Sequence, residues 1–220
     1  MRKLLIVFAI IIIILSAAIA SAQGELSLLY FYSTTCGQCK SVEPIVQELS
    51  KTYPIEGLVY GKGESAAMPF PVRKADKATS SKYGISGVPV LAVLENGAIR
   101  QAIRGENDIR TSPNIIRALS KGALSVSEMV ANGPQKTYIV TGWVVSRGAY
   151  FKGAKFFLTD RQQTIMIKPW RPLEAVKSPF KAARPGMMSD IIDKPVYLEG
   201  MLTKADGNLQ FTVGKELNFE

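Results

Sequence analysis

Residues 26–39 read Leu26-Ser27-Leu28-Leu29-Tyr30-Phe31-Tyr32-Ser33-Thr34-Thr35-Cys36-Gly37-Gln38-Cys39. The run up to Tyr32 is short, apolar and aromatic, which predicts a buried strand. Beyond Cys39, apolar side chains recur at the spacing of one helical face, at Val42, Ile45, Val46 and Leu49. Pro44 lies inside that helix and is expected to bend it, because proline removes an amide hydrogen bond. The two cysteines therefore lie where a buried strand passes into a helix.

The chain lacks the residue types that several common catalytic and metal sites require. The 220 residues include two cysteines and no histidine. These numbers exclude a Ser-His-Asp triad, a Cys-His protease pair, a histidine metal site and four-cysteine zinc or iron–sulfur sites. With 47% hydrophobic and 20% charged residues, the chain is expected to fold, at a length that suits two domains.

A dithiol at a helix start is suited to disulfide exchange. The helix dipole stabilises a thiolate at Cys36, and Lys40 adds positive charge nearby. Cys36 is therefore predicted to be the nucleophile and Cys39, one turn later, the resolving thiol. Their disulfide is the expected redox centre, with no other cofactor and no metal. The alternative is a purely structural disulfide, but a loop this short gives little stabilisation.

The rest of the first half predicts two more strands and a second helix. Val88–Leu94 is an apolar run, and Asn96-Gly97 is a hairpin signal that joins it to Ala98–Ile103. Thr111-Ser112-Pro113 is typical of a helix start, and Gly122 of a helix end. The pattern changes after Gly122, which predicts a domain boundary there.

Two segments of this first half resemble the thioredoxin family. They are Tyr30 to Lys40, with Pro44 five residues after the second cysteine, and Lys82-Tyr83-Gly84-Ile85-Ser86-Gly87-Val88-Pro89-Val90, followed by Glu95-Asn96-Gly97 and Gly105. The resemblance implies an α/β thioredoxin fold over residues 23–122 and a thiol–disulfide oxidoreductase that acts on protein dithiols and disulfides. It also implies a cis Val88–Pro89 peptide bond against the disulfide. Val88, Pro89, Gly37 and Gln38 would then contact the client, with the Val88 backbone pairing to a client strand.

Two positions depart from the family pattern. Tyr30 stands where the family usually has a buried aspartate, six residues before the first cysteine, and Gln38 stands where it usually has proline. Changes in the dipeptide between the cysteines alter thiolate stability and hence the reduction potential. Dithiol exchange is expected to remain, while the direction of electron flow is left open between oxidase and reductase. We predict that Cys36 and Cys39 form a moderately reducing couple that a membrane donor keeps reduced.

The second half predicts a small all-β domain over residues 123–220. Ser125-Val126-Ser127-Glu128 is a capping box for a short helix. Five strands are expected, with an Asp206-Gly207 hairpin before the last; they are Thr137–Val145, Lys155–Leu158, Thr164–Ile167, Pro195–Leu202 and Leu209–Val213. A basic, proline-rich connection (Lys168–Gly186) and a helical turn (Met187–Ile192) separate the third and fourth strands. This order predicts a five-stranded Greek-key barrel.

Three phrases in this half resemble the oligonucleotide/oligosaccharide-binding (OB) fold. They are Val140–Val144, Phe156–Asp160 and Val196–Leu202. The resemblance implies a fold and no particular ligand.

The N-terminal segment predicts export. Arg2 and Lys3 precede an apolar run from Leu4 to Leu15, and Ala20-Ser21-Ala22 ends the segment with small residues. This pattern is typical of a signal peptide over residues 1–22, cut before Gln23. The alternative is an uncleaved membrane anchor, which would bring this segment into contact with the membrane. Either case places the folded part in the periplasm or on another extracytoplasmic face, where disulfides persist.

Positive charge is concentrated in the second half. From Arg147 to Arg184 there are nine basic and two acidic residues, and aromatic residues are interleaved, among them Tyr150, Phe151, Phe156, Phe157 and Trp170. Such a mixture occurs on surfaces that bind single-stranded nucleic acid. Aromatic residues in a barrel more often fill its core, and an exported protein meets little nucleic acid. A protein or another anionic partner, or a spacer role without a ligand, is therefore expected instead.

Two functions remain from the sequence. One is an extracytoplasmic thiol–disulfide oxidoreductase whose barrel positions clients or a redox partner. The other is an exported basic OB-type binding module whose thioredoxin-like part is mainly scaffold. The first explains the dithiol and the export signal together, whereas the second leaves the dithiol unexplained.

Overall fold

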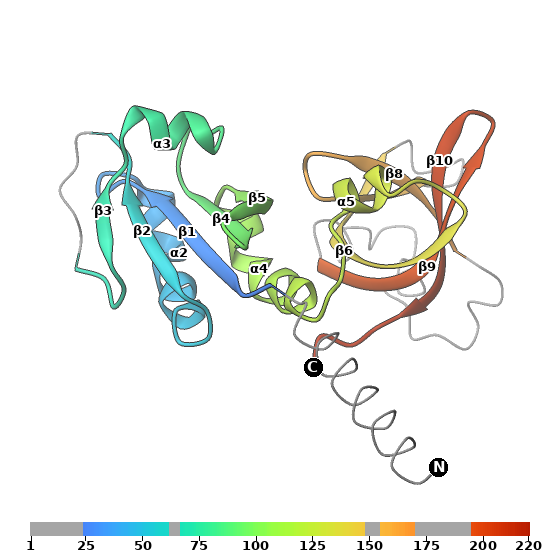
Figure 1. The fold of residues 1–220 in the computed structure, drawn as a ribbon, viewed down its shortest axis with the longest axis horizontal. Coiled ribbons are helices and arrows are strands. Elements are labelled where there is room, and N and C mark those ends of the chain that lie inside the picture. The colour runs from blue at the N-terminus through green and yellow to red at the C-terminus, as the bar shows by residue number, and fades with distance from the viewer. Residues whose placement is uncertain (1–23, 62–66, 148–154, 170–194) are drawn as a thin grey trace, which may run out of the picture.

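The protein was analysed as a computed structural model, which describes residues 24–61, 67–147, 155–169 and 195–220. An α/β unit is followed by a β-barrel, and helix α4 lies between the sheet and the barrel (Figure 1). The predicted signal peptide or anchor, the predicted helical turn Met187–Ile192 and nearly all of the basic connection before that turn lie outside the described residues. In the described part of the chain, no helix is long and apolar enough to cross a membrane.

The first unit is a five-stranded mixed sheet in the order β3-β2-β1-β4-β5. Its strands are β1 (Leu26–Tyr32), β2 (Ile55–Val59), β3 (Val72–Lys74), β4 (Val90–Glu95) and β5 (Ala98–Arg104). The central strand β1 runs parallel to β2 and antiparallel to β4. Because side chains alternate along a strand, β1 buries Tyr30 and Tyr32 on one face and Leu29 and Phe31 on the other.

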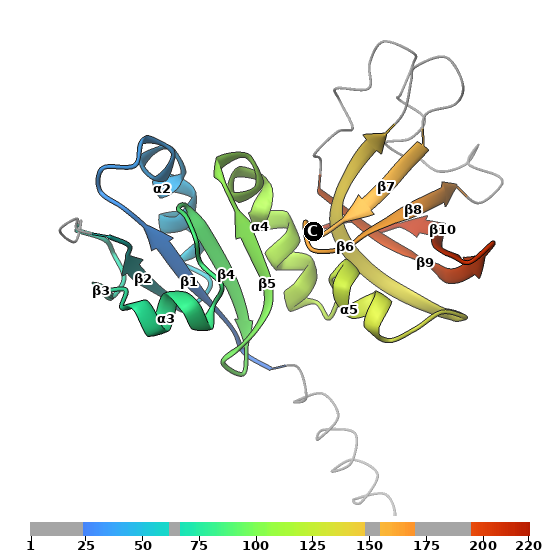
Figure 2. The same ribbon diagram turned by 90° about the horizontal axis from the view of Figure 1, so that it is seen from above.

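Helices α2 (Gly37–Leu49) and α4 (Glu106–Ser120) cover the face with Tyr30, and the short helix α3 (Lys77–Lys82) lies at the opposite face (Figure 2). The expected α/β fold is confirmed, and so is the hairpin: Asn96 and Gly97 take φ values of 52° and 78°, as a two-residue hairpin turn requires.

The start of α4 differs from the prediction. The helix begins at Glu106 and contains Pro113, whereas Thr111 was expected to open it. Proline cannot donate to the carbonyl four residues earlier, that of Ile109. The Ser112 hydroxyl donates to that carbonyl instead, at 2.8 Å, so the helix continues past the proline. Gly122, two residues after the helix, takes the left-handed conformation expected at a helix end.

The second unit is a closed five-stranded barrel in the order β10-β8-β7-β6-β9, which confirms the predicted small barrel. Its strands are β6 (Lys136–Arg147), β7 (Lys155–Thr159), β8 (Thr164–Pro169), β9 (Pro195–Ala205) and β10 (Asn208–Glu216). Strands β8 and β10 pair in parallel, and the other pairs are antiparallel. Helix α5 (Val126–Ala131) carries the predicted capping box, in which Ser125 and Glu128 cap each other.

The two units share buried contacts. Trp143 of β6 is fully buried and belongs to the core cluster of the first unit, and its indole N–H donates to the Thr111 hydroxyl at 2.8 Å. Arg161, in the β7–β8 turn, forms two hydrogen bonds to Asp108 of α4, at 2.7 and 2.9 Å. The Arg161 guanidinium also lies 5.4 Å from the centre of the Trp143 ring.

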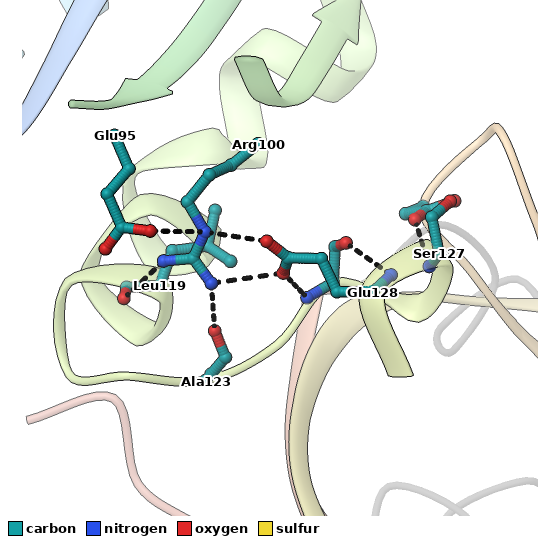
Figure 3. A network of polar contacts seen from close by, with 8 residues as sticks. Glu95, Arg100, Leu119, Ala123, Ser127 and Glu128 are labelled. Atoms are coloured by element: carbon teal, nitrogen blue, oxygen red, sulfur yellow. Dashed lines mark hydrogen bonds and ion pairs between the residues drawn. The ribbon is translucent and has the colours of Figure 1, made fainter. Parts of the chain in front are cut away.

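A second link joins β5 to α5 through Arg100 (Figure 3). The Arg100 guanidinium donates to both carboxylate oxygens of Glu128, at 2.9 and 3.1 Å, and to the carbonyls of Leu119 and Ala123, at 3.2 and 2.8 Å. Glu95 lies 3.6 Å away on the other side. The barrel, with α5 packed in its core, is therefore fixed both to α4 and to β5 of the sheet.

Candidate functional site

Cys36 and Cys39 form a disulfide at the N-terminus of α2, with their Cα atoms 5.2 Å apart. Cys36 is the N-cap residue, in extended conformation, and its sulfur accepts a hydrogen bond from the Cys39 N–H at 3.1 Å. Cys36 is partly exposed, whereas Cys39 is only 2% exposed. A backbone N–H aimed at the Cys36 sulfur favours its thiolate in the reduced protein, and exposure makes Cys36 the sulfur that a client can reach.

The Val88–Pro89 peptide bond lies opposite the disulfide and is cis, as the sequence resemblance implied. The Cys36 sulfur is 3.9 Å from the Val88 carbonyl oxygen. Pro89 is buried, and its carbonyl accepts a hydrogen bond from the Gly105 N–H at 3.0 Å. The structure thus brings Val88 and Pro89 to the two cysteines, although about fifty residues separate the two pairs in the sequence.

Tyr30 lies beneath the second cysteine. Its hydroxyl donates to the Cys39 carbonyl at 3.0 Å, its ring stacks on Tyr32 at 5.1 Å between centroids, and no part of it is exposed. Burial, and then the nearby charges of Glu43 and Tyr32, raise the pKa of Tyr30 far above its usual range. Tyr30 therefore stays neutral at physiological pH and acts as a hydrogen-bond donor. It cannot accept the Cys39 proton as a carboxylate in its place would.

Gly37 and Gln38 are exposed between the cysteines. Gln38 lines a shallow pocket of about 380 Å³ together with the end of β5 and the first residues of α4, which are Arg104, Gly105, Glu106, Asn107 and Asp108. The pocket thus includes a residue from between the two cysteines and is lined mostly by polar groups. The client-binding roles of Gly37, Gln38, Val88 and Pro89 stay predictions.

A clamp between α2 and α4 was not found from the sequence. Ser41, two residues after Cys39, donates to Glu106 at 2.5 Å, and Arg110 donates to the Ser41 oxygen at 2.9 Å and to Glu106 at 2.8 Å. These hydrogen bonds, first from Ser41 and then from Arg110, hold the pKa of Glu106 below its usual range. The spacing of Glu106 and Arg110 fits a helical ion pair, but nothing in the sequence connects them to Ser41.

Of the aromatic residues considered for nucleic-acid binding, the structure describes Phe156 and Phe157. Phe156 and Phe157 are half-buried, and Phe156 packs against the barrel core. Tyr150, Phe151 and Trp170 lie outside the described residues.

Comparisons with known proteins match the first unit. A family model described as Thioredoxin matches residues 16–118. Thioredoxin 1 of Plasmodium falciparum is 31% identical over 87 residues, covering 40% of this chain and 74% of that protein. Human protein disulfide-isomerase A4 is 27% identical over 101 residues, covering 46% of this chain and only 14% of that protein. Among solved structures, a mutant thioredoxin from Halobacterium salinarum is 25% identical, with a TM-score of 0.33, covering 44% of this chain and 76% of that one.

Proposed function

Because the chain belongs to the thioredoxin family, we propose that it is a thiol–disulfide oxidoreductase that exchanges disulfides with protein substrates through Cys36 and Cys39. One observation carries the proposal. The partly exposed Cys36 sulfur receives a backbone N–H and lies 3.9 Å from the Val88 carbonyl, while Cys39 is buried directly behind it. This arrangement separates the attacking thiol from the resolving thiol.

In the reducing direction, the Cys36 thiolate attacks one sulfur of a client disulfide. A mixed disulfide forms, and the other client sulfur leaves as a thiolate. The Cys39 thiolate then attacks the Cys36 sulfur, the Cys36–Cys39 disulfide forms, and the client leaves as a dithiol carrying two electrons from the protein. The same steps in reverse oxidise a client. During the mixed disulfide, the Val88 backbone is suited to pair with an extended client strand.

The proposed location is extracytoplasmic. Its support is the sequence of residues 1–22, with a basic start, an apolar run and a small-residue end. The same segment, if uncleaved, would hold the protein at the membrane near a redox donor. The barrel, which we take to be OB-like because of its strand order, would position clients or that donor.

The proposed direction is reduction, with a moderately reducing couple. Family couples span roughly −270 to −120 mV, and about 30 mV changes a two-electron equilibrium tenfold. Equilibration with glutathione gives the potential, and trapping the thiols in intact cells gives the redox state. A value near the oxidising end, with the protein mostly in the disulfide form, would replace the reductase proposal with an oxidase.

The decisive experiment traps clients. Cys39→Ala removes the resolving thiol, so mixed disulfides through Cys36 should accumulate and disappear on reduction. Cys36→Ala is the matched control and should collect none. Covalent partners on the control alone would reverse the two roles. Partners on neither variant, together with two thiols that do not interconvert under mild oxidant and reductant, would favour a binding module with a structural disulfide.

A further inference from the structure

One residue, Asp108, connects the pocket beside Gln38 with the barrel. Asp108 lines that pocket, and both of its carboxylate oxygens accept hydrogen bonds from Arg161 of the β7–β8 turn. Asp108 and Trp143 are both buried, and Trp143 also bonds to α4, so the turn is held firmly against the first turns of the helix. Figure 2 shows this end of the barrel lying alongside α4.

When the ion pairs within the protein are set aside, the side chains that line this pocket leave a net positive charge. The carboxylate of Glu106 is bound by Ser41 and Arg110, and that of Asp108 by Arg161. Arg104 is exposed, donates to the Gly84 carbonyl at 3.2 Å and makes no ion pair with any described residue. The two carboxylates that line the pocket are thus already paired with arginines, and the cationic Arg104 remains for a partner.

From these observations we propose that clients dock across both domains. In this model, which rests on the proposed function, an extended client segment with acidic side chains runs from the mixed disulfide at Cys36, through the pocket beside Gln38, to the β7–β8 turn. Gln162, exposed and next to Arg161, is then within reach of the bound segment. The barrel supplies part of the client surface, and Arg161 is a positioning residue that holds the turn at the pocket.

The test uses the full chain with Cys39→Ala and defined peptides. Each 15-residue peptide has one central cysteine, activated as a disulfide with nitrothiobenzoate, flanked on both sides by aspartates or, in the matched peptide, by lysines. Attack by Cys36 releases the coloured thiolate and leaves the peptide covalently bound. A photoreactive benzophenone amino acid replaces Gln162 or, as a control, Lys204 in the β9–β10 hairpin, on the side of the barrel away from α4 (Figure 2).

Illumination of the aspartate complex should crosslink the peptide at position 162 and not at position 204. The aspartate peptide should react about threefold faster than the lysine peptide at low salt, as one exposed ion pair allows. Arg104→Gln should reduce that ratio, and Arg73→Gln on the distant strand β3 should leave it unchanged. Release of the coloured thiolate without crosslinks at 162, or with equal crosslinks at both positions, would overturn the two-domain surface. Absence of release from either peptide would overturn the proposed function itself.

Discussion

Arg100 makes several polar contacts between the two units, so replacing it should lower the stability of the folded protein. Its side chain is 9% exposed, and its guanidinium binds the Glu128 carboxylate and two backbone carbonyls, with the Glu95 carboxylate 3.6 Å away (Figure 3). Arg100→Met keeps the apolar stem of the side chain and removes every one of these contacts. Glu128 would then remain half-buried without its main partner.

The expected loss follows from burial. Removing one partner of a fully buried ion pair costs about 3–5 kcal/mol. The Glu128 side chain is 30% exposed and regains some hydration, which lowers the cost. The Ala123 carbonyl loses its arginine donor, which raises the cost, while the Leu119 carbonyl still accepts from the Gly122 N–H. The free energy of unfolding at pH 7 should therefore fall by about 3 kcal/mol.

The loss should also depend on pH. Burial alone would raise the pKa of Glu128, but hydrogen bonds from Arg100 and from the Ser125 N–H hold it below its usual range. A carboxyl with a lowered pKa in the folded state stabilises the protein above its unfolded pKa, about 4.3, and that contribution is lost as the pH falls through the folded pKa. Without Arg100, burial is the dominant influence on the pKa of Glu128, and the variant no longer loses this contribution to stability as the pH falls. The two proteins should therefore differ less at pH 3.5 than at pH 7.

Urea unfolding followed by far-UV circular dichroism at both pH values measures this difference. Arg73→Met, which removes an exposed ion pair to Glu56, is the control and should change stability by less than about 0.5 kcal/mol. A loss below about 1 kcal/mol for Arg100→Met at pH 7 would show that the contacts in Figure 3 carry little net energy. An equal loss at both pH values would refute the role assigned to Glu128.

Three other outcomes are expected. Limiting alkylation of the reduced protein near neutral pH should label Cys36 before Cys39, by mass spectrometry of the peptides; preferential labelling of Cys39 would contradict the assigned roles. Tyr30→Phe removes a buried hydrogen-bond donor to the Cys39 carbonyl but keeps the ring, so the free energy of unfolding should fall by about 1 kcal/mol in thermal or urea unfolding. An unchanged free energy of unfolding would show that the hydroxyl does not stabilise the fold. Gln101, 1% exposed, finds no hydrogen-bond partner for its amide among the described residues, so Gln101→Leu should stabilise the fold by about 1 kcal/mol, whereas a loss of stability would point to a buried water as the partner.

Local chemistry in the sequence predicted much of the site. The strand ending at Tyr32, the helix opening at Cys36, the Asn96-Gly97 turn and the Ser125 capping box all depend on neighbouring residues, and all are present. The cis bond before Pro89 came from resemblance alone, since no local pattern distinguishes it from an ordinary proline.

Elements with weak local signals were missed. Strand β3 has three residues, two of them basic and exposed, and helix α3 buries none of its residues. Strand β2 contains both Glu56 and Gly57, which interrupt an apolar run. The true start of α4 was missed because a proline such as Pro113 is typical of a first helical turn. Pro113 instead lies inside the helix, where the Ser112 hydroxyl donates a hydrogen bond to the Ile109 carbonyl.

The relation between the two units was the least predictable feature, since it rests on contacts between residues far apart in the chain. In the sequence, Trp143 is one apolar residue of a barrel strand, and Arg161 is one of many basic residues. In the structure, Trp143 completes the core of the first unit and Arg161 neutralises the buried Asp108 beside the pocket. A chain ending at Gly122 would lose both residues, leaving the face of α4 under Trp143 exposed to water and Asp108 without its cation. A barrel joined to the redox unit only by a free linker would need neither contact, so these two residues hold the barrel in one position on α4.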